Sequence, residues 1–313
     1  MESDPFLQRL VSAFAEVPGV EAIVLGGSRA RGTAHCKSDY DIGLYYAGAA
    51  PIDTDRLREA ARRLADRPSV TAVTPIGEWG PWIVGGAWLS IKGQKVDLLY
   101  RNIEAVAHVV EACRSGDITM HYQPGHPHGF CSAIWAGEIA LCRPLHDPQG
   151  AVVGLKSLAL PYPAPLREAL VRRFQWEILF SIENAELATS RQERTHIAGC
   201  VYRALACIAQ VLFALNERYL INEKGALEEA ESLPLTLPEL EDRVAVPAHP
   251  AEFLHDRPDH DVGIAGDRRG VERHRVVRLD PARGGVDLRD ELRRGAVHGR
   301  LLPQVWGLPT TRT

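Results

Sequence analysis

Two carboxylates near the start of the chain have the type and spacing that phosphate chemistry needs. Asp39 and Asp41 are separated by one residue within the stretch Ser38-Asp39-Tyr40-Asp41-Ile42-Gly43-Leu44. Residues two apart in a strand point to the same face, so the two side chains are expected to project together. Like charges held side by side repel each other unless a cation lies between them. The pair therefore predicts a site for Mg²⁺, which binds through one or two carboxylates together with substrate phosphates.

A glycine turn precedes this pair by about ten residues. The apolar run Ile23-Val24-Leu25 breaks at Gly26-Gly27-Ser28. Glycine lets a phosphate approach the backbone closely, and the turn offers N–H groups and a hydroxyl. A short helix starting at Ser28 would add the positive end of its dipole. A phosphate cradle followed by a metal-binding pair predicts nucleotide chemistry.

A third carboxylate, Asp97, stands alone in the apolar run Lys95-Val96-Asp97-Leu98-Leu99-Tyr100. Burying an unpaired carboxylate costs several kcal/mol, so such an acid favours a functional role. Glu138, in Trp135-Ala136-Gly137-Glu138-Ile139, is a minor candidate for a second base. Alone, the glycine turn would fit an ordinary turn and the acidic pair a solvated edge strand, so the prediction depends on their combination.

These residues resemble the nucleotidyltransferase superfamily that includes DNA polymerase β. Its pattern is an apolar residue, Gly, Gly or Ser, a spacer of about ten residues, Asp-x-Asp within a strand, and a third acid on a neighbouring strand. The form Gly-Ser-x-Ala-Arg-Gly, here beginning at Gly27, with Ser-Asp-x-Asp behind it, is most similar to small prokaryotic members, the minimal and antibiotic-modifying enzymes. The motifs cover residues 20 to 101, about a quarter of the chain.

The resemblance implies a function and a set of site residues. A nucleoside triphosphate (NTP) would bind at the glycine turn, with Mg²⁺ as cofactor, two ions being expected. NTP-binding residues would be Gly26, Gly27, Ser28, Arg29 and Arg31. Either arginine could reach a triphosphate or serve only in packing. Catalytic and metal-binding residues would be Asp39, Asp41 and Asp97, and the third acid can be a metal ligand or the base that takes the acceptor's proton.

The acceptor is open at this point. A hydroxyl of a small, aminoglycoside-like molecule is the first choice, because the second half of the chain is helical and the net charge is −4. Transfer to a protein or RNA, as in minimal nucleotidyltransferases paired with helical toxins, is the alternative. A non-catalytic nucleotide-binding module is the third hypothesis, although the presence of all three acids argues against it.

The composition sets the class of protein. A chain of 313 residues can form two domains, and 45% hydrophobic with 24% charged residues is typical of a soluble globular protein. The negative net charge argues against extended nucleic-acid binding, which needs a basic face. The N-terminus shows no signal-peptide pattern, and no uninterrupted apolar stretch predicts a membrane span. Six cysteines without CxxC spacing fit reduced thiols in the cytoplasm.

Apolar spacing predicts an α+β (α/β) fold, a mixed nucleotidyltransferase-like sheet with flanking helices followed by a helical domain. The predicted helices are 5–16, 53–66 and 103–113, and the predicted strands are 20–25, 39–46, 70–73, 87–91 and 95–100. The catalytic domain is assigned to residues 1–150, a proline-rich hinge to 151–165 and the helical domain to 166–246. Within the helical domain, apolar residues at helical spacing predict an antiparallel helix pair, with one helix over 166–185 and the next over 197–215.

Two further stretches have no settled role. Trp79, Trp82 and Trp88 could stack on a base, but packing is the simpler interpretation. The loop 121–131 holds three histidines and a cysteine, which are zinc ligands, yet their spacing matches no closed zinc site.

Composition changes after about residue 246. Residues 247–313 lose the apolar period, contain no lysine and are crowded with Arg, Asp, His and Gly, which predicts a poorly ordered tail. Two explanations stay open: an authentic extension, or a reading frame lost near residues 245–250.

Overall fold

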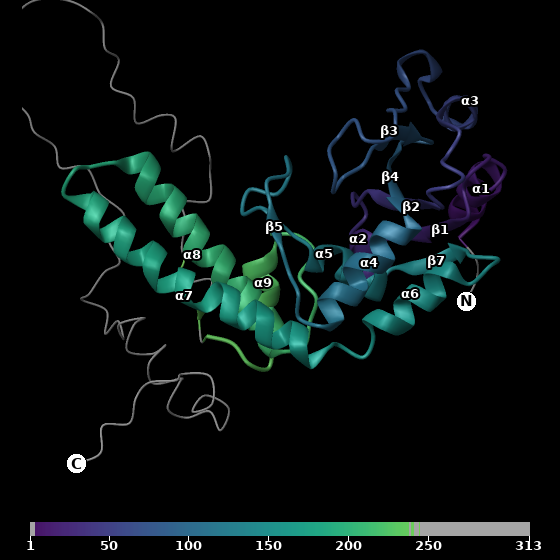
Figure 1. The fold of residues 1–313 in the computed structure, drawn as a ribbon. Helices are drawn as coiled ribbons and strands as arrows, with labels where there is room; N and C mark the ends of the chain where they lie inside the picture. Colours follow the sequence, from purple (N-terminus) through teal and green to yellow (C-terminus); the bar gives the residue numbers. More distant parts are fainter. Residues whose placement is uncertain (1–3, 238, 241–243, 245–313) are drawn as a thin grey trace, which may run out of the picture. The chain divides into compact units, whose positions relative to one another are not determined.

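The fold is a mixed sheet covered by helices and continued by a pair of long helices (Figure 1). The computed structural model describes residues 4–237, 239, 240 and 244. The main sheet has the strand order β3-β4-β2-β1-β7, in which β2 and β4 are parallel and the other pairs antiparallel. The strands of this sheet are β1 Ala22–Leu25, β2 Tyr40–Tyr46, β3 Gly86–Ile91, β4 Gln94–Asn102 and β7 Arg143–His146.

One face of the sheet forms the main hydrophobic core. Along β2 the side chains alternate, so that Tyr40, Ile42 and Leu44 are buried on one side while Asp41 and Gly43 face the other. Helices α1 Pro5–Phe14 and α3 Thr54–Leu64 pack on the buried side through apolar residues at helical spacing. The alternation of β2 thus assigns the acidic positions to the face opposite this core.

The opposite face is partly covered by a second group of helices. These are α4 Ile103–Arg114, α5 Ala133–Leu141 and α6 Ala151–Ala159, which contact one another. The short helix α2 Gly27–Arg31 follows β1 and contacts both β2 and α5. A small hairpin of β5 Met120–His121 and β6 Phe130–Cys131 encloses the histidine loop.

The C-terminal part of the described chain is helical, as predicted. Helices α7 Ala164–Thr189 and α8 Arg194–Leu215 form an antiparallel pair, and α9 Ala226–Glu231 packs against α8. The predicted fold class, an α/β sheet region with a helical C-terminal region, is confirmed. Within the range predicted as a hinge, 151–165, the structure has α6 over Ala151–Ala159, and α7 begins at Ala164.

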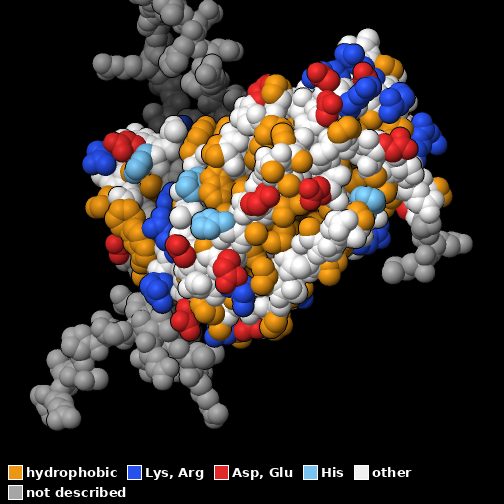
Figure 2. Space-filling model, turned by 45° about the vertical axis from the view of Figure 1, so that its right-hand side comes forward, with side chains coloured by type: hydrophobic (Ala, Val, Ile, Leu, Met, Phe, Trp, Pro, Cys, Tyr) orange, Lys and Arg blue, Asp and Glu red, His pale blue; other side chains and the backbone are white. Residues whose placement is uncertain are grey.

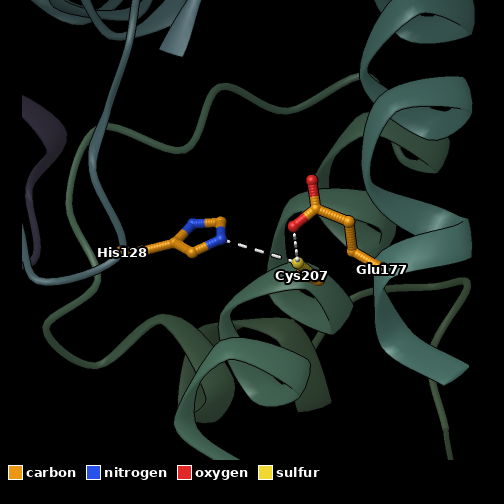
Figure 3. A group of neighbouring side chains, drawn as sticks. All are labelled: His128, Glu177 and Cys207. Atoms are coloured by element: carbon orange, nitrogen blue, oxygen red, sulfur yellow. Dashed lines mark hydrogen bonds between the residues drawn. The ribbon is translucent and has the colours of Figure 1, made fainter. Parts of the chain in front are cut away.

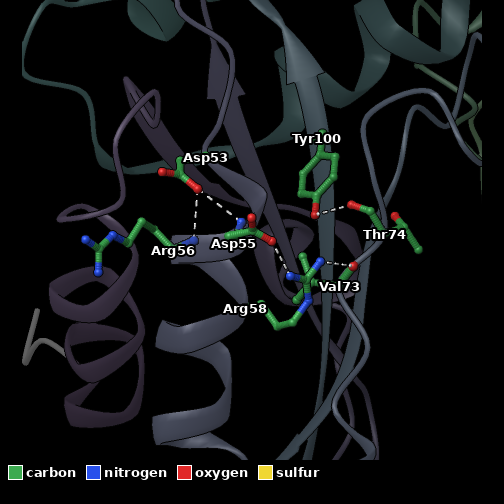
Figure 4. Close-up of polar contacts among 7 residues, drawn as sticks. All are labelled: Asp53, Asp55, Arg56, Arg58, Val73, Thr74 and Tyr100. Atoms are coloured by element: carbon green, nitrogen blue, oxygen red, sulfur yellow. Dashed lines mark hydrogen bonds and ion pairs between the residues drawn. The ribbon is translucent and has the colours of Figure 1, made fainter.

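The predicted strand at 70–73 is wrong. Residues Pro68–Val70 form a 3₁₀ turn, and the segment that follows is held by side chains of α3 and β4 (Figure 4) and by one backbone bond, from the Thr74 N–H to the Gly86 carbonyl at 3.0 Å. Arg58 of α3 donates to the Val73 carbonyl at 3.3 Å, and the Tyr100 hydroxyl donates to the Thr74 carbonyl at 3.1 Å. Asp53 caps α3, because its Oδ1 accepts from the N–H groups of Asp55 and Arg56.

Helix α8 is long and apolar enough to cross a membrane by length and composition alone. This helix departs from the expectation that no apolar stretch of the chain predicts a membrane span. Half of the apolar window is buried inside the structure, and the helix contains Arg203, paired with Glu177 of α7. Core helices of globular proteins pass the same test, so this property is weak support for a membrane span.

The domain boundaries stay predictions. Residues 1–244 form one compact unit, and α6, which begins at Ala151, packs against α4 and α5. The predicted tail, 247–313, and the hypothesis of a lost reading frame lie outside the described residues.

Candidate active site

The three predicted acids come together on one face of the sheet. Asp41 of β2 and Asp97 of β4 are direct partners in the parallel register, so their side chains lie next to each other. Asp39 lies one residue before β2 begins, where its side chain is 39% exposed. The Lys95 ammonium is 4.0 Å from Asp39 Oδ1 at the solvent-exposed side of the group. The sequence prediction that these carboxylates meet therefore fits the geometry, with Asp39 outside the strand.

Electrostatics make Asp41 the most perturbed member of this group. Burial raises the pKa of Asp41 to about 6, and the charges of Asp97 and Asp39 add to the effect. Burial also raises the pKa of Asp97, with Asp39 again contributing. Lys224, between α8 and α9, opposes the shift at both carboxyl groups. Together these shifts describe a site that is too negative for its surroundings and is suited to a cation.

The glycine turn is built against Asp41. The Gly26 N–H donates to the Asp41 carbonyl at 2.8 Å, and Gly27 has a left-handed φ of +58°. A Cβ on Gly27 would lie 1.8 Å from Asp41 Oδ2, so only glycine fits at this position. Ser28 follows in the first turn of α2. The predicted phosphate cradle and the predicted metal-binding carboxylate are thus in direct contact.

The two predicted NTP-binding arginines make protein contacts in this structure. Arg29 donates to the carbonyls of Ser38 at 2.7 Å and Asp39 at 3.1 Å, and its guanidinium lies 3.8 Å above the Tyr40 ring. These contacts position the segment that holds Asp39. Arg31 pairs with Glu229 of α9 at 2.8 Å. Binding of NTP by either arginine stays a prediction.

Glu138 has a partner that the sequence did not reveal. Both of its carboxylate oxygens accept from Arg101, at 2.8 and 2.9 Å, and Arg101 is 3% exposed. Arg101 therefore occupies both oxygens of this carboxylate. The geometry favours a structural ion pair for Glu138 over the role of second base.

The histidine loop borders the helical region through Glu223. Glu223 accepts from the His128 N–H at 3.2 Å, and its other oxygen is 3.4 Å from His126 Nδ1. The next residue, Lys224, is the cation that acts on Asp41 and Asp97. Sequence spacing alone does not indicate which residue of the polar segment after α8 approaches the acids.

A second group of possible metal ligands lies in this region: His128, Glu177 and Cys207, all buried (Figure 3). His128 Nε2 is 3.5 Å from Cys207 Sγ, which is 3.9 Å from Glu177 Oε2. That oxygen already accepts from Arg203 Nε at 2.8 Å. Burial raises the pKa of Cys207 to about 12, so the sulfur is a thiol rather than a thiolate. Hydrogen bonds and the ion pair account for this group without a metal.

The part of the chain that holds the glycine turn, Asp39 and Asp41 is similar to a known protein family. Residues 8–73 match the Polbeta family model, described as polymerase beta, nucleotidyltransferase. The matched region contains Gly26, Gly27, Ser28, Asp39 and Asp41 and ends before Asp97. It supports a general nucleotidyl-transfer activity for the chain.

No curated protein matches the sequence. Among solved structures, a nucleotidyltransferase-like protein from Exiguobacterium sibiricum superposes with a TM-score of 0.34 at 12% identity. That superposition covers 76% of this chain and 69% of the other.

The contact between Gly27 and Asp41 predicts a specific defect. Gly27→Ala should cost about 1–2 kcal/mol of folding stability because φ is left-handed, and it should also abolish stabilisation by Mg²⁺ because its Cβ displaces the Asp41 carboxylate. Gly93→Ala is the matched control, since Gly93 has a φ of +73° and open space around it. Thermal unfolding with and without Mg²⁺ measures both effects. An unchanged Mg²⁺ response in Gly27→Ala would contradict the contact.

The raised pKa of Asp41 predicts a stability that depends on pH. The carboxyl group ionises near 3.8 in the unfolded chain and near 6 in the folded protein, so ionisation opposes folding as the pH rises through this range. Asp41→Asn should therefore stabilise the metal-free protein by about 1–3 kcal/mol at pH 8 and have little effect below about pH 4. Urea denaturation in EDTA measures this difference.

Asp66 provides a control of opposite sign. Its pKa is lowered by hydrogen bonds from the Gly93 N–H, the Ser90 hydroxyl and the Lys92 N–H, so its ionised form favours folding. Asp66→Asn should lower the stability at pH 8. A loss of stability at pH 8 in Asp41→Asn as well would contradict the proposed repulsion.

Proposed function

We propose that this protein is a Mg²⁺-dependent nucleotidyltransferase that moves a nucleoside monophosphate from an NTP to a hydroxyl of a small, aminoglycoside-like molecule. The observation that supports it most strongly is the register that sets Asp41 beside Asp97, with the Gly27 turn in contact with Asp41. Phosphate oxygens at the turn would then lie next to the acids. The match to the nucleotidyltransferase family model over residues 8–73 supports the same reaction class.

The acids fit the hard oxygen ligands that Mg²⁺ prefers. Asp39, Asp41 and Asp97 are the residues that would hold it. Burial raises the pKa of Asp41, the charges of Asp97 and Asp39 add to that shift, and a divalent cation would balance these charges. Bound there, Mg²⁺ would neutralise charge on the phosphate oxygens. Two ions are expected from the superfamily resemblance.

The chain's own residues have separate tasks in this reaction. The Gly27-Ser28 turn holds the β- and γ-phosphates through backbone N–H groups and the hydroxyl. The Asp97 carboxylate takes the proton of the acceptor hydroxyl, whose oxygen then bonds to the α-phosphorus while the bond to the β-phosphate oxygen breaks and pyrophosphate leaves. Burial and Asp39 raise the pKa of Asp97, which brings this carboxylate closer to a useful base at neutral pH. A purely metal-binding Asp97 is the alternative role.

A screen with labelled nucleotides tests the proposed function. ATP, GTP, CTP and UTP labelled at the α-phosphate are incubated with Mg²⁺ and either aminoglycosides, a protein acceptor or RNA, and pyrophosphate release is followed in parallel. We expect the label in a small-molecule acceptor and none with Asp41→Asn. Labelling of protein or RNA instead would support the alternative acceptors, and tight NTP binding without transfer to any of them would support a non-catalytic module.

Asp97→Ala should lower turnover by about 10²- to 10⁴-fold, the contribution of a positioned base. If Asp97 is only the base, the affinity for NTP and the Mg²⁺ dependence should change little. If it is a metal ligand, the Mg²⁺ concentration for half-maximal activity should rise. Steady-state kinetics over a Mg²⁺ titration separate the two roles, and full activity in Asp97→Ala would remove Asp97 from the site.

A further inference from the structure

Trp88 is a large aromatic side chain exposed directly beside a proposed catalytic acid. It lies on β3, the edge strand of the sheet, and its partner in the antiparallel register is Asp97. Paired residues of neighbouring strands point to the same face, so the indole lies beside the Asp97 carboxylate. Trp88 is 69% exposed. An exposed indole in register with a carboxylate offers a ligand an apolar ring face next to a negative charge.

The indole is held in place by a second tryptophan. The rings of Trp79 and Trp88 are stacked, with centroids 4.4 Å apart and an interplanar angle of 21°. The Trp79 backbone is anchored in turn, because its carbonyl accepts from Gln123 Nε2 at 3.1 Å and Gln123 is buried. A Cβ on Gly86 would meet the Leu98 carbonyl oxygen at 1.7 Å and Trp79 Cζ3 at 3.2 Å, so the Trp79 ring also lies against β3. The stacked pair thus presents the exposed Trp88 indole as an aromatic surface.

The strand order indicates whether this aromatic surface lies on the NTP side or on the acceptor side of the acids. Four functional groups lie side by side across the sheet. Their spatial order is the Gly27 turn after β1, Asp41 on β2, Asp97 on β4 and Trp88 on β3. Adjacent strands are about 4.8 Å apart, which puts the Trp88 strand about 10 Å from that of Asp41, on the side away from the turn. With pyrophosphate leaving toward the turn, an in-line attack brings the acceptor from the Asp97 and Trp88 side.

We infer that the Trp79–Trp88 pair binds the acceptor by stacking the Trp88 indole on its ring, an inference that rests on the proposed function. The acceptor class that fits is a hydroxylated ring bearing ammonium groups. The face of an indole attracts cations, and the neighbouring Asp39 and Asp97 carboxylates add to this attraction. A nucleic-acid acceptor would bring phosphates toward these acids and be repelled, with Lys95 as the exposed cation that pairs with Asp39. Figure 2 shows acidic side chains set among hydrophobic ones on one face of the molecule.

Variants of Trp88 test the inference, with a matched control on the helical pair. Trp88→Ala removes the stacking surface and Trp88→Phe keeps a smaller one. Trp176→Ala is the control, because Trp176 of α7 is also about half exposed, at 52%, and has an aromatic neighbour, Phe180. We expect Trp88→Ala to raise the KM and the Kd for the acceptor by about threefold to thirtyfold, Trp88→Phe by less, and Trp176→Ala not at all. The KM for NTP and the melting temperature should stay unchanged.

The probes are kanamycin, streptomycin and spectinomycin, with an oligoribonucleotide for comparison, and binding is measured by calorimetry independently of turnover. Transfer in the wild type with an unchanged acceptor KM in Trp88→Ala would overturn the inference and leave the proposed function intact. Binding that depends on Trp88 without any transfer would support the acceptor surface and refute the proposed function. The inference also fails if none of the three aminated probes binds, or if Trp88→Ala weakens only the oligoribonucleotide.

Discussion

The repulsion between Asp41 and Asp97 is the constraint on which the site depends. The parallel register of β2 and β4 makes these acids direct neighbours, and burial prevents water from screening their charges. Ion-paired Arg101 and Glu138 lie beneath them, and Lys224 approaches from the helical region without cancelling their charge. Such an arrangement lowers the folding stability in the absence of a cation. Destabilising charge clusters of this kind are typical of functional sites.

Packing on the other face of the sheet offsets the free-energy cost of holding these carboxylates together. The alternation along β2 puts Tyr40, Ile42 and Leu44 into a well-packed core with α1 and α3 while Asp41 faces away from it. Arg29 fixes the segment before the strand through two backbone carbonyls and the Tyr40 ring. The strands can therefore hold two carboxylates side by side because the opposite face supplies the stability.

Local patterns predicted much of this arrangement and none of its long-range partners. The apolar alternation around Asp41 and Asp97, and the glycine turn, are local signals that survive folding because backbone geometry sets them. The predicted strand at 70–73 is wrong because Thr71 bonds back to its own 3₁₀ turn, and the carbonyls of Val73 and Thr74 accept from side chains of α3 and β4. The Glu138–Arg101 pair and the approach of Lys224 join residues 37 or more positions apart, and no spacing in one sequence encodes such contacts. The sequence favours packing for Trp88, whereas the structure leaves it exposed on the edge strand β3, a position that only the sheet order reveals.

Mn²⁺ binding followed by electron paramagnetic resonance tests the central claim most directly, because Mn²⁺ takes the same oxygen ligands as Mg²⁺ and reports occupancy without turnover. The wild-type protein, Asp41→Asn and Asp97→Asn would be titrated with Mn²⁺ in the presence of a non-hydrolysable NTP analogue. The account predicts a saturable site in the wild type, made tighter by the analogue and lost or weakened by at least tenfold in Asp41→Asn. Equal Mn²⁺ affinity in all three proteins would contradict a shared cation between Asp41 and Asp97.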